Sequence, residues 1–364
     1  MEKRSLMLTV KKNYTQEVPE SQIEQTGEKN VMFERYKGNP IIEPTENDWE
    51  SCATFNPTAT FDGKTIHLLY RAIGEYKNYI SRVGYAVSKD GINFKRYNKP
   101  VLEPTEKYDK WGCEDPRITK IEDEFYITYT ALSQHPLGKL SLPRVALAST
   151  KDFINFKKHG IITPEGTEEK DVVLFPEKIK GRYVMLHRPY NWIKKFTCKK
   201  NGKLYLKTKE DKLIEWPAEK YPDYIPEKPS IWIAYSSDLK HWSEHKVVME
   251  PKAQSWQSEK IGAGPSPIKT DKGWLLIYHG IDKNTVYRAG IALLDLENPG
   301  TVTARSLYPA LEPKKDYEKK GDTKNTVFPE GAIIRDGRLF IYYGAADKTC
   351  CLATCKLDKL LSSF

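Results

Sequence analysis

Short runs of apolar and aromatic residues alternate with polar turns along the chain, and these runs lack the periodicity of helices. Five of them follow a proline-containing segment and a tight turn: 67–71, 126–130, 184–188, 275–279 and 340–344. Turn pairs such as Asp62-Gly63 and Asp336-Gly337 between such runs are typical of β-hairpins. The pattern therefore predicts an all-β protein built from repeated hairpins.

The hairpins recur at a nearly constant spacing. Their prolines lie 59, 60, 89 and 64 residues apart, at Pro57, Pro116, Pro176, Pro265 and Pro329. A second strand-like segment follows each hairpin, so each repeat holds about four strands in about 60 residues, as a propeller blade does. The longest interval contains a lysine-rich stretch over 194–212, which indicates an insertion of roughly 30 residues in the third repeat.

We therefore predict a five-bladed β-propeller over residues 31–364, with a lysine-rich insertion in the third blade. A polar N-terminal arm over residues 1–30 precedes it. An all-β sandwich in which the spacing is coincidental is the alternative fold. The arm and the insertion offer surfaces on which a homo-oligomer could form.

Composition excludes some classes of protein. The chain has 364 residues with a net charge of +9 and a mean hydropathy of −0.63. It lacks the roughly 18 consecutive apolar residues of a membrane helix and the features of a signal peptide. We expect a cytoplasmic protein without a membrane partner. The lysine-rich stretch has no associated nucleic-acid motif, so a solvated insertion is favoured and no nucleic-acid partner is expected.

The six cysteines predict neither a disulfide framework nor a metal site. Cys350 and Cys351 are adjacent in a strand-like segment, so their side chains should point to opposite faces. No pair has the spacing of a zinc ligand set. We expect reduced, structural cysteines and no bound metal.

Equivalent positions of the repeats should converge at the axis of a propeller. This symmetry gathers the residues that flank the repeated prolines: Asn56, Asp115, Arg117, Glu177, Lys178, Ser266 and Glu330. Asp115 adjoins Glu114 and precedes a proline. In a crowded acidic site its pKa would be raised, which makes it a candidate general acid. An Asp-Pro turn with a surface arginine is the structural alternative.

Basic residues lie on or beside the same strands: Arg71, Lys178, Arg188, His279 and Arg288. Long cationic side chains that end near the axis can hold an anion such as phosphate. Tyr287, next to Arg288, suits packing and ligand contact equally. Taken singly, each basic residue is also explained by a salt bridge or a structural role.

Eight ordered motifs extend this picture: 56–57, 70–72, 113–117, 175–179, 185–189, 260–264, 278–280 and 343–347. Together they resemble glycoside hydrolase family 130 over residues 33–357. The resemblance implies a five-bladed propeller that cleaves β-1,2- or β-1,4-linked mannosides with inversion. Inorganic phosphate is the implied co-substrate, mannose 1-phosphate the product, and no further cofactor is implied.

The resemblance also implies roles for individual residues. Asp115 matches the single catalytic acid, which protonates the glycosidic oxygen through the 3-hydroxyl of the mannose. The implied mannose-binding residues are Asn56, Arg71, Glu114 and Asp347. The implied phosphate-binding residues are Lys178, Arg188, His279, Tyr287 and Arg288.

Three other functions stay open. A β-mannosidase would need a carboxylate base to activate water, and Glu177, Glu259 and Glu330 are candidates. A non-catalytic sugar-binding propeller would bind mannosides without turnover. Other five-bladed hydrolases would need three separated carboxylates. Phosphate is already a nucleophile and needs a cationic pocket instead, so the basic residues favour phosphorolysis.

Overall fold

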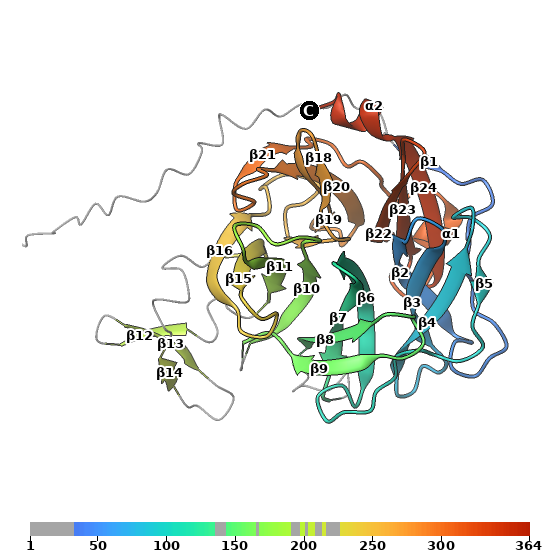
Figure 1. Ribbon diagram of the computed structural model, residues 1–364, viewed down its shortest axis with the longest axis horizontal. Helices are drawn as coiled ribbons and strands as arrows, with labels where there is room; N and C mark the ends of the chain where they lie inside the picture. The colour runs from blue at the N-terminus through green and yellow to red at the C-terminus, as the bar shows by residue number, and fades with distance from the viewer. Residues whose placement is uncertain are drawn as a thin grey trace, which may run out of the picture.

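The computed structural model describes residues 33–134, 143–164, 167–190, 197–200, 203–207, 213–215 and 226–364. Its strands form antiparallel blades that stand around a central axis (Figure 1). The predicted five-bladed β-propeller is confirmed, and the sandwich alternative is wrong. The predicted N-terminal arm lies outside the described residues.

The first three blades follow one another in chain order. Blade one contains β2 (Ala53–Phe61), β3 (Ile66–Ile73), β4 (Ser81–Ser88) and β5 (Lys95–Arg96). Blade two contains β6 (Gly112–Ile121), β7 (Glu124–Leu132), β8 (Arg144–Thr150) and β9 (Lys157–Ile161). Blade three contains β10 (Glu169–Leu174), β11 (Tyr183–Pro189), β15 (Ile231–Ser236) and β16 (Ser243–Met249). One parallel bridge, between Ser81 and Gly112, joins blades one and two.

The last two blades complete the ring. Blade four contains β17 (Lys260–Ala263), β18 (Ile268–Thr270), β19 (Gly273–Ile281), β20 (Tyr287–Leu294) and β21 (Val302–Arg305). Blade five contains β22 (Val327–Arg335), β23 (Arg338–Ala345), β24 (Thr349–Lys356) and β1 (Glu34–Arg35). Because β1 pairs with β24, through Glu34 opposite Thr354, a strand from the start of the chain closes the final blade.

The remaining elements are short. The strands β12 (Thr197–Lys200), β13 (Lys203–Lys207) and β14 (Leu213–Glu215) form a separate sheet inserted between β11 and β15. The predicted insertion in the third blade is therefore confirmed. The helices are α1 (Asp316–Lys319) and α2 (Leu357–Leu361). Within the ranges described above, neither helix has the length and apolar character needed to cross a membrane.

The hydrophobic core is divided among the interfaces between neighbouring blades. Between blades one and two, for example, Leu69 packs in the same cluster as Ile127. Successive side chains of a strand point to opposite faces, so each blade contributes to both of its neighbours. Accordingly Cys350 lies in the cluster between blades five and one, and Cys351 in the cluster between blades four and five. The prediction for these two side chains is confirmed.

The innermost strands carry the feature that builds the site. Four of them are interrupted at the same point by a β-bulge, and the bulged positions include Asn56, Asp115, Asp171 and Glu330. In blade four, a break between β17 and β18 takes the place of the bulge. A β-bulge changes the direction in which the side chain at the bulge points. In each of blades one, two, three and five, one polar residue is therefore directed toward the axis.

Candidate active site

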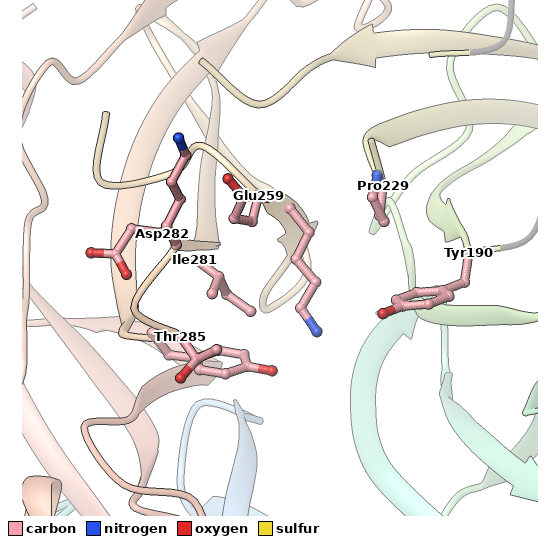
Figure 2. Close-up of a pocket in the computed structure, with 9 residues that line it drawn as sticks. Tyr190, Pro229, Glu259, Ile281, Asp282 and Thr285 are labelled. Atoms are coloured by element: carbon pink, nitrogen blue, oxygen red, sulfur yellow. The ribbon is translucent and has the colours of Figure 1, made fainter. Parts of the chain in front are cut away.

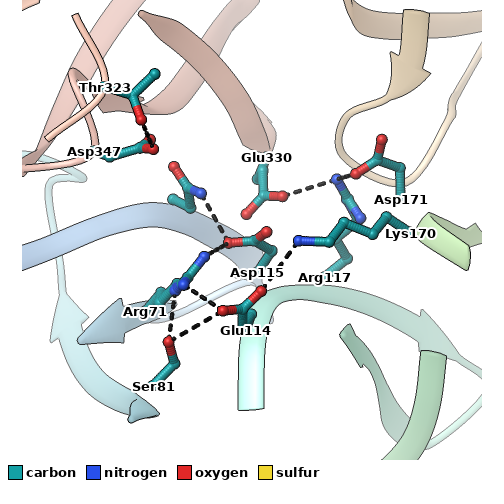
Figure 3. A network of polar contacts seen from close by, with 11 residues as sticks. Arg71, Ser81, Glu114, Asp115, Arg117, Lys170, Asp171, Thr323, Glu330 and Asp347 are labelled. Atoms are coloured by element: carbon teal, nitrogen blue, oxygen red, sulfur yellow. Dashed lines mark hydrogen bonds and ion pairs between the residues drawn. The ribbon is translucent and has the colours of Figure 1, made fainter. Parts of the chain in front are cut away.

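Asp115 lies at the centre of a buried polar network around the axis (Figure 3). Its Oδ1 accepts a hydrogen bond of 2.8 Å from Asn56 Nδ2 and one of 3.1 Å from Arg71. Both Asn56 and Asp115 have φ of 49°, a left-handed conformation that asparagine and aspartate tolerate better than most residues. In the described part of the chain Oδ2 has no hydrogen-bond partner, so this oxygen is available to carry a proton.

Arg71 connects Asp115 to a second carboxylate. It forms an ion pair with Glu114 and donates from Nε to Ser81 Oγ over 2.9 Å. Lys170 Nζ lies 3.1 Å from the other oxygen of Glu114. Because every charged group has a partner of opposite sign, this buried cluster holds its geometry before any ligand arrives.

The charges around Asp115 decide its protonation. Burial raises the pKa of Asp115, but Arg71, Lys170 and the hydrogen bond from Asn56 together hold it below its usual value. The expectation of a raised pKa in the free protein is therefore wrong. Acidic neighbours are present, as expected, but the adjacent cations outweigh them.

Asp171 organises the neighbouring side of the axis. One oxygen lies 3.0 Å from Arg117, and the other forms an ion pair with Arg188 and lies 3.5 Å from His279 Nε2. Arg117 also lies 2.8 Å from Glu330. Asp171 thus fixes Arg117, whose charge acts on Asp115, and Arg188, which lies beside the pocket described below.

Asp347 faces this network from blade five, in the turn after β23 (Figure 3). Its Oδ2 accepts a 2.6 Å hydrogen bond from Thr323. Burial raises the pKa of Asp347 to about 6, although Thr323 and Arg71 act in the opposite direction. A carboxyl group of this kind can accept or donate a hydrogen bond to a sugar hydroxyl near neutral pH.

A pocket of about 580 Å³ opens between blades three and four (Figure 2). Its lining includes Lys260, Tyr190 and Tyr287. The Lys260 ammonium lies 5.8 Å from the centre of the Tyr190 ring and 5.2 Å from that of Tyr287. Burial, with Arg188 nearby, lowers the pKa of Lys260 to about 7. Such a half-buried lysine, adjacent to an arginine, is suited to bind an anion in its charged form.

Most of the predicted site residues meet around this axis. Asn56, Arg71, Glu114 and Asp115 share one network, and Asp347 faces it. On the anion side, Arg188 and His279 meet at Asp171, and Tyr287 lines the pocket.

Two predicted phosphate ligands differ from the expectation, Lys178 in its position and Arg288 in its partner. Lys178 is in an exposed turn, with its ammonium 4.5 Å from the centre of the Tyr183 ring. Its neighbour Glu177 forms an exposed ion pair with Lys269. Arg288 pairs with Asp282, which lines the pocket, over 2.8 Å. The structure therefore does not bring Lys178 to the axis, and it holds Arg288 against a carboxylate.

The misplacement of Lys178 has a structural cause. The sequence repeat aligned Pro176 with Pro57 and Pro116, but the bulge of blade three is at Asp171 and is followed by Val172. Because that blade has no proline at its bulge, the proline pattern selected a turn at the other end of β10.

Sequence reasoning missed three residues for related reasons: Lys170, Asp171 and Lys260. Lys170 and Asp171 are a charged pair that directly precedes the apolar run 172–174, and this was the sequence signal available for them. Lys260 belongs to one of the family-like motifs, but nothing in the sequence indicated that it would be half-buried beside a pocket. Across the described ranges, no cluster of three or more metal-ligating side chains is present.

A propeller with a cluster of buried carboxyl groups at its axis, one of them with an available oxygen, and a pocket lined by a lysine beside it defines a class, the glycoside-cleaving propeller enzymes. The chain belongs to glycoside hydrolase family 130. The family model, described as β-1,4-mannooligosaccharide phosphorylase, matches residues 32–228 and 224–364.

Individual relatives agree with this assignment. The chain is 41% identical to a 1,2-β-oligomannan phosphorylase of Thermoanaerobacter sp. strain X514, over 87% of this chain and 95% of the relative. It is 32% identical to a β-1,4-mannooligosaccharide phosphorylase of Ruminococcus albus, over 92% and 90% of the two chains. A β-1,2-mannobiose phosphorylase from Listeria innocua, solved with β-1,2-mannobiose, superimposes with a TM-score of 0.73 at 29% identity, covering 91% of this chain and 98% of that one.

Proposed function

We propose that this protein is an inverting β-mannoside phosphorylase that releases mannose 1-phosphate. The observation that carries the proposal is the juxtaposition of one available carboxyl group, Asp115, with a pocket that Lys260 lines and that Arg188 adjoins. An acid and an anion site are what phosphorolysis needs.

In this mechanism Asn56, Arg71, Glu114 and Asp347 hold the mannose ring at the axis. A phosphate oxygen attacks the anomeric carbon while the bond from that carbon to the leaving oxygen breaks. The proton of Asp115 passes to the leaving oxygen by way of the mannose 3-hydroxyl. The new bond forms on the face opposite the broken one, so the anomeric configuration inverts.

Bound phosphate would also raise the pKa of Asp115. We assign its contacts to Lys260, Arg188 and Tyr287, with Lys170 between this group and Asp115, in place of Lys178. A bound phosphate adds negative charge near Lys170, one of the cations that hold the pKa of Asp115 down. Its arrival therefore raises the pKa of Asp115 and favours the protonated form that the reaction requires.

The hydrolase alternative finds less support, because each of its candidate bases is paired with a cation, including Glu259, which lines the pocket. Glu177 pairs with Lys269 in an exposed turn, and Glu259 pairs with Lys228 over 3.1 Å. Glu330 is fully buried against Arg117, and burial raises its pKa well above the usual value. A protonated carboxyl group cannot activate water as a base.

The linkage we propose is β-1,2. The relative with 41% identity is named for 1,2-β-oligomannan, whereas the relative named for β-1,4-mannooligosaccharides is 32% identical. The Listeria innocua enzyme, whose structure superimposes on this one, was solved with β-1,2-mannobiose.

Product analysis tests the proposal. Purified protein is incubated with β-1,2- or β-1,4-mannobiose, with and without inorganic phosphate, and mannose 1-phosphate and free mannose are quantified. We expect phosphate-dependent mannose 1-phosphate from the β-1,2-linked substrate, reduced about 100- to 10,000-fold in Asp115→Asn. Tyr308→Ala, an exposed residue, is the matched control and should retain full activity.

The other outcomes separate the alternatives. Free mannose released at the same rate without phosphate would establish a β-mannosidase. Binding of mannobiose without any product, in both the wild type and Asp115→Asn, would instead identify a sugar-binding propeller.

A further inference from the structure

An aromatic pair lies at the rim of the site, in the connection between β3 and β4. Tyr76 and Tyr79 stack with their ring centres 6.3 Å apart and an interplanar angle of 29°. Tyr79 is half-buried and packs against the apolar cluster of Ala53, Phe55 and Ile73. Tyr76 lies against the ring of Tyr79 and has 47% of its surface exposed. This is the largest exposed fraction among the exposed large hydrophobic residues of the described ranges.

The exposed ring is held in place by polar contacts. Lys348 Nζ donates to the Tyr76 hydroxyl over 2.8 Å, and that hydroxyl donates to Asp322 Oδ1 over 3.1 Å. The Lys348 ammonium also lies 5.5 Å from the centre of the Tyr76 ring. An exposed side chain fixed in this way loses little further conformational entropy when a ligand covers it.

Tyr79 contacts the proposed sugar-binding network directly, and Tyr76 is joined to it through Lys348 and Asp322. The Arg71 guanidinium, which contacts Asp115, lies 5.8 Å from the centre of the Tyr79 ring. Lys348 directly follows Asp347, and Asp322 directly precedes Thr323, the hydrogen-bond donor of Asp347. The rim pair therefore lies next to the position proposed for the mannose ring.

The arrangement of the blades indicates which part of a substrate would reach this rim. The proposed phosphate contacts come from blades three and four, whereas the rim pair and its anchors come from blade one and from the segments that flank β22 and β23 of blade five. In an inverting displacement, the nucleophile and the leaving group lie on opposite faces of the anomeric carbon. The rim pair is therefore on the leaving-group side.

We propose that Tyr76 and Tyr79 form a binding subsite for a distal sugar ring of the leaving mannan chain, one unit or more beyond the scissile bond. An aromatic face is suited to cover the apolar C–H face of a pyranose, and the Tyr76 hydroxyl adds a polar contact. This inference rests on the proposed function. It makes the protein prefer oligosaccharides longer than the disaccharide.

A chain-length series tests the subsite. Phosphorolysis of β-1,2-linked mannobiose, mannotriose and mannotetraose is measured for the wild type, Tyr76→Ala and Tyr308→Ala. We expect Tyr76→Ala to lower kcat/KM for the tri- or tetrasaccharide about 5- to 10-fold and to leave that for the disaccharide unchanged. Tyr76→Phe, which keeps the ring, should retain most of the preference for longer chains. The exposed Tyr308 is the control, and its replacement should not alter the length dependence.

The results separate the subsite from the proposed function. An active wild type whose length dependence is unaltered in Tyr76→Ala would overturn the subsite and leave the phosphorylase assignment intact. If the wild type has no phosphorolytic activity, calorimetric titration with the same oligosaccharides still decides the question. Equal affinities of the wild type and Tyr76→Ala for mannotetraose would then overturn the subsite as well.

Discussion

Asp115 and Asp171 occupy the same position in neighbouring blades. Each lies at the bulge of an innermost strand, and each has a left-handed backbone, with φ of 49° and 57°. Their surroundings differ. Asp115 accepts its hydrogen bonds on one oxygen, whereas both oxygens of Asp171 are engaged by arginines. The same local geometry therefore leaves one carboxyl oxygen available in blade two, where we propose the reacting acid, and provides an anchor for cations in blade three.

The anchor role of Asp171 depends on a glycine. A Cβ at Gly262 would lie 2.2 Å from Asp171 Oδ2 and 2.5 Å from His279 Cε1. We expect Gly262→Ala to displace Asp171 and with it Arg188, and so to lower kcat/KM for phosphate at least about 10-fold, at an overpacking cost of about 1–3 kcal/mol. Steady-state kinetics and thermal unfolding measure the two effects.

Gly300→Ala is the matched control, because its Cβ would meet nothing closer than 3.6 Å. Unchanged kinetics in this variant, together with a loss in Gly262→Ala, would support the steric argument. Wild-type kinetics in Gly262→Ala would contradict the claim that Asp171 positions Arg188.

Glu330 provides a second prediction. Burial raises its pKa, and Arg117 already faces Asp171, so a second buried negative charge at Glu330 is disfavoured. An amide reproduces the shape of a protonated carboxyl group, and we therefore expect Glu330→Gln to keep kcat within about threefold of the wild type. A loss of several hundredfold, measured with saturating phosphate, would indicate that an ionised Glu330 takes part in the reaction.

Lys178 and Lys260 give opposite expectations. Loss of a charge-assisted hydrogen bond to phosphate costs about 1.5–3 kcal/mol, so Lys260→Met should raise the KM for phosphate roughly 10- to 100-fold. Lys178→Ala removes an exposed lysine and should change this KM less than about twofold. Initial rates at varied phosphate and saturating mannoside measure both. The reverse ranking would restore Lys178 as the phosphate ligand.

The sequence predicted the parts of the site that repeat and missed those that depend on packing. Asn56 and Asp115 precede prolines at equivalent points of two repeats, and both lie at bulges as the repeat implies. Asp171 lies at the third such bulge without a proline, so its equivalence is visible only from the strand pairing.

Protonation was predictable only in part, for a physical reason. The pKa of a carboxyl group depends on distances to charges from other blades, and Lys170 lies 55 residues from Asp115 in the chain. That lysine and Arg71 together reverse the direction expected from the acidic neighbours alone. The sequence shows which charged residues exist, but the closure of the ring determines which of them meet.

The pH dependence of phosphate use follows from Lys260. Burial lowers its pKa to about 7, so it is charged below pH 7 and loses its charge as the pH rises through that value in the free protein. Affinity for phosphate should therefore fall at higher pH. Arginine stays charged throughout this range, so in Lys260→Arg the pH dependence that Lys260 adds to phosphate affinity disappears.

The experiment compares the KM for phosphate of the wild type with that of Lys260→Arg at each pH. Dividing the first value by the second cancels the effect that the titration of phosphate itself has on both. We expect this ratio to rise about 30-fold between pH 6 and about pH 8.5, because the slope approaches tenfold per unit above a pKa of about 7. A ratio that stays constant over the range would show that Lys260 does not titrate there or does not contact phosphate. Lys178→Arg, with its exposed side chain, is the control that should give a flat ratio.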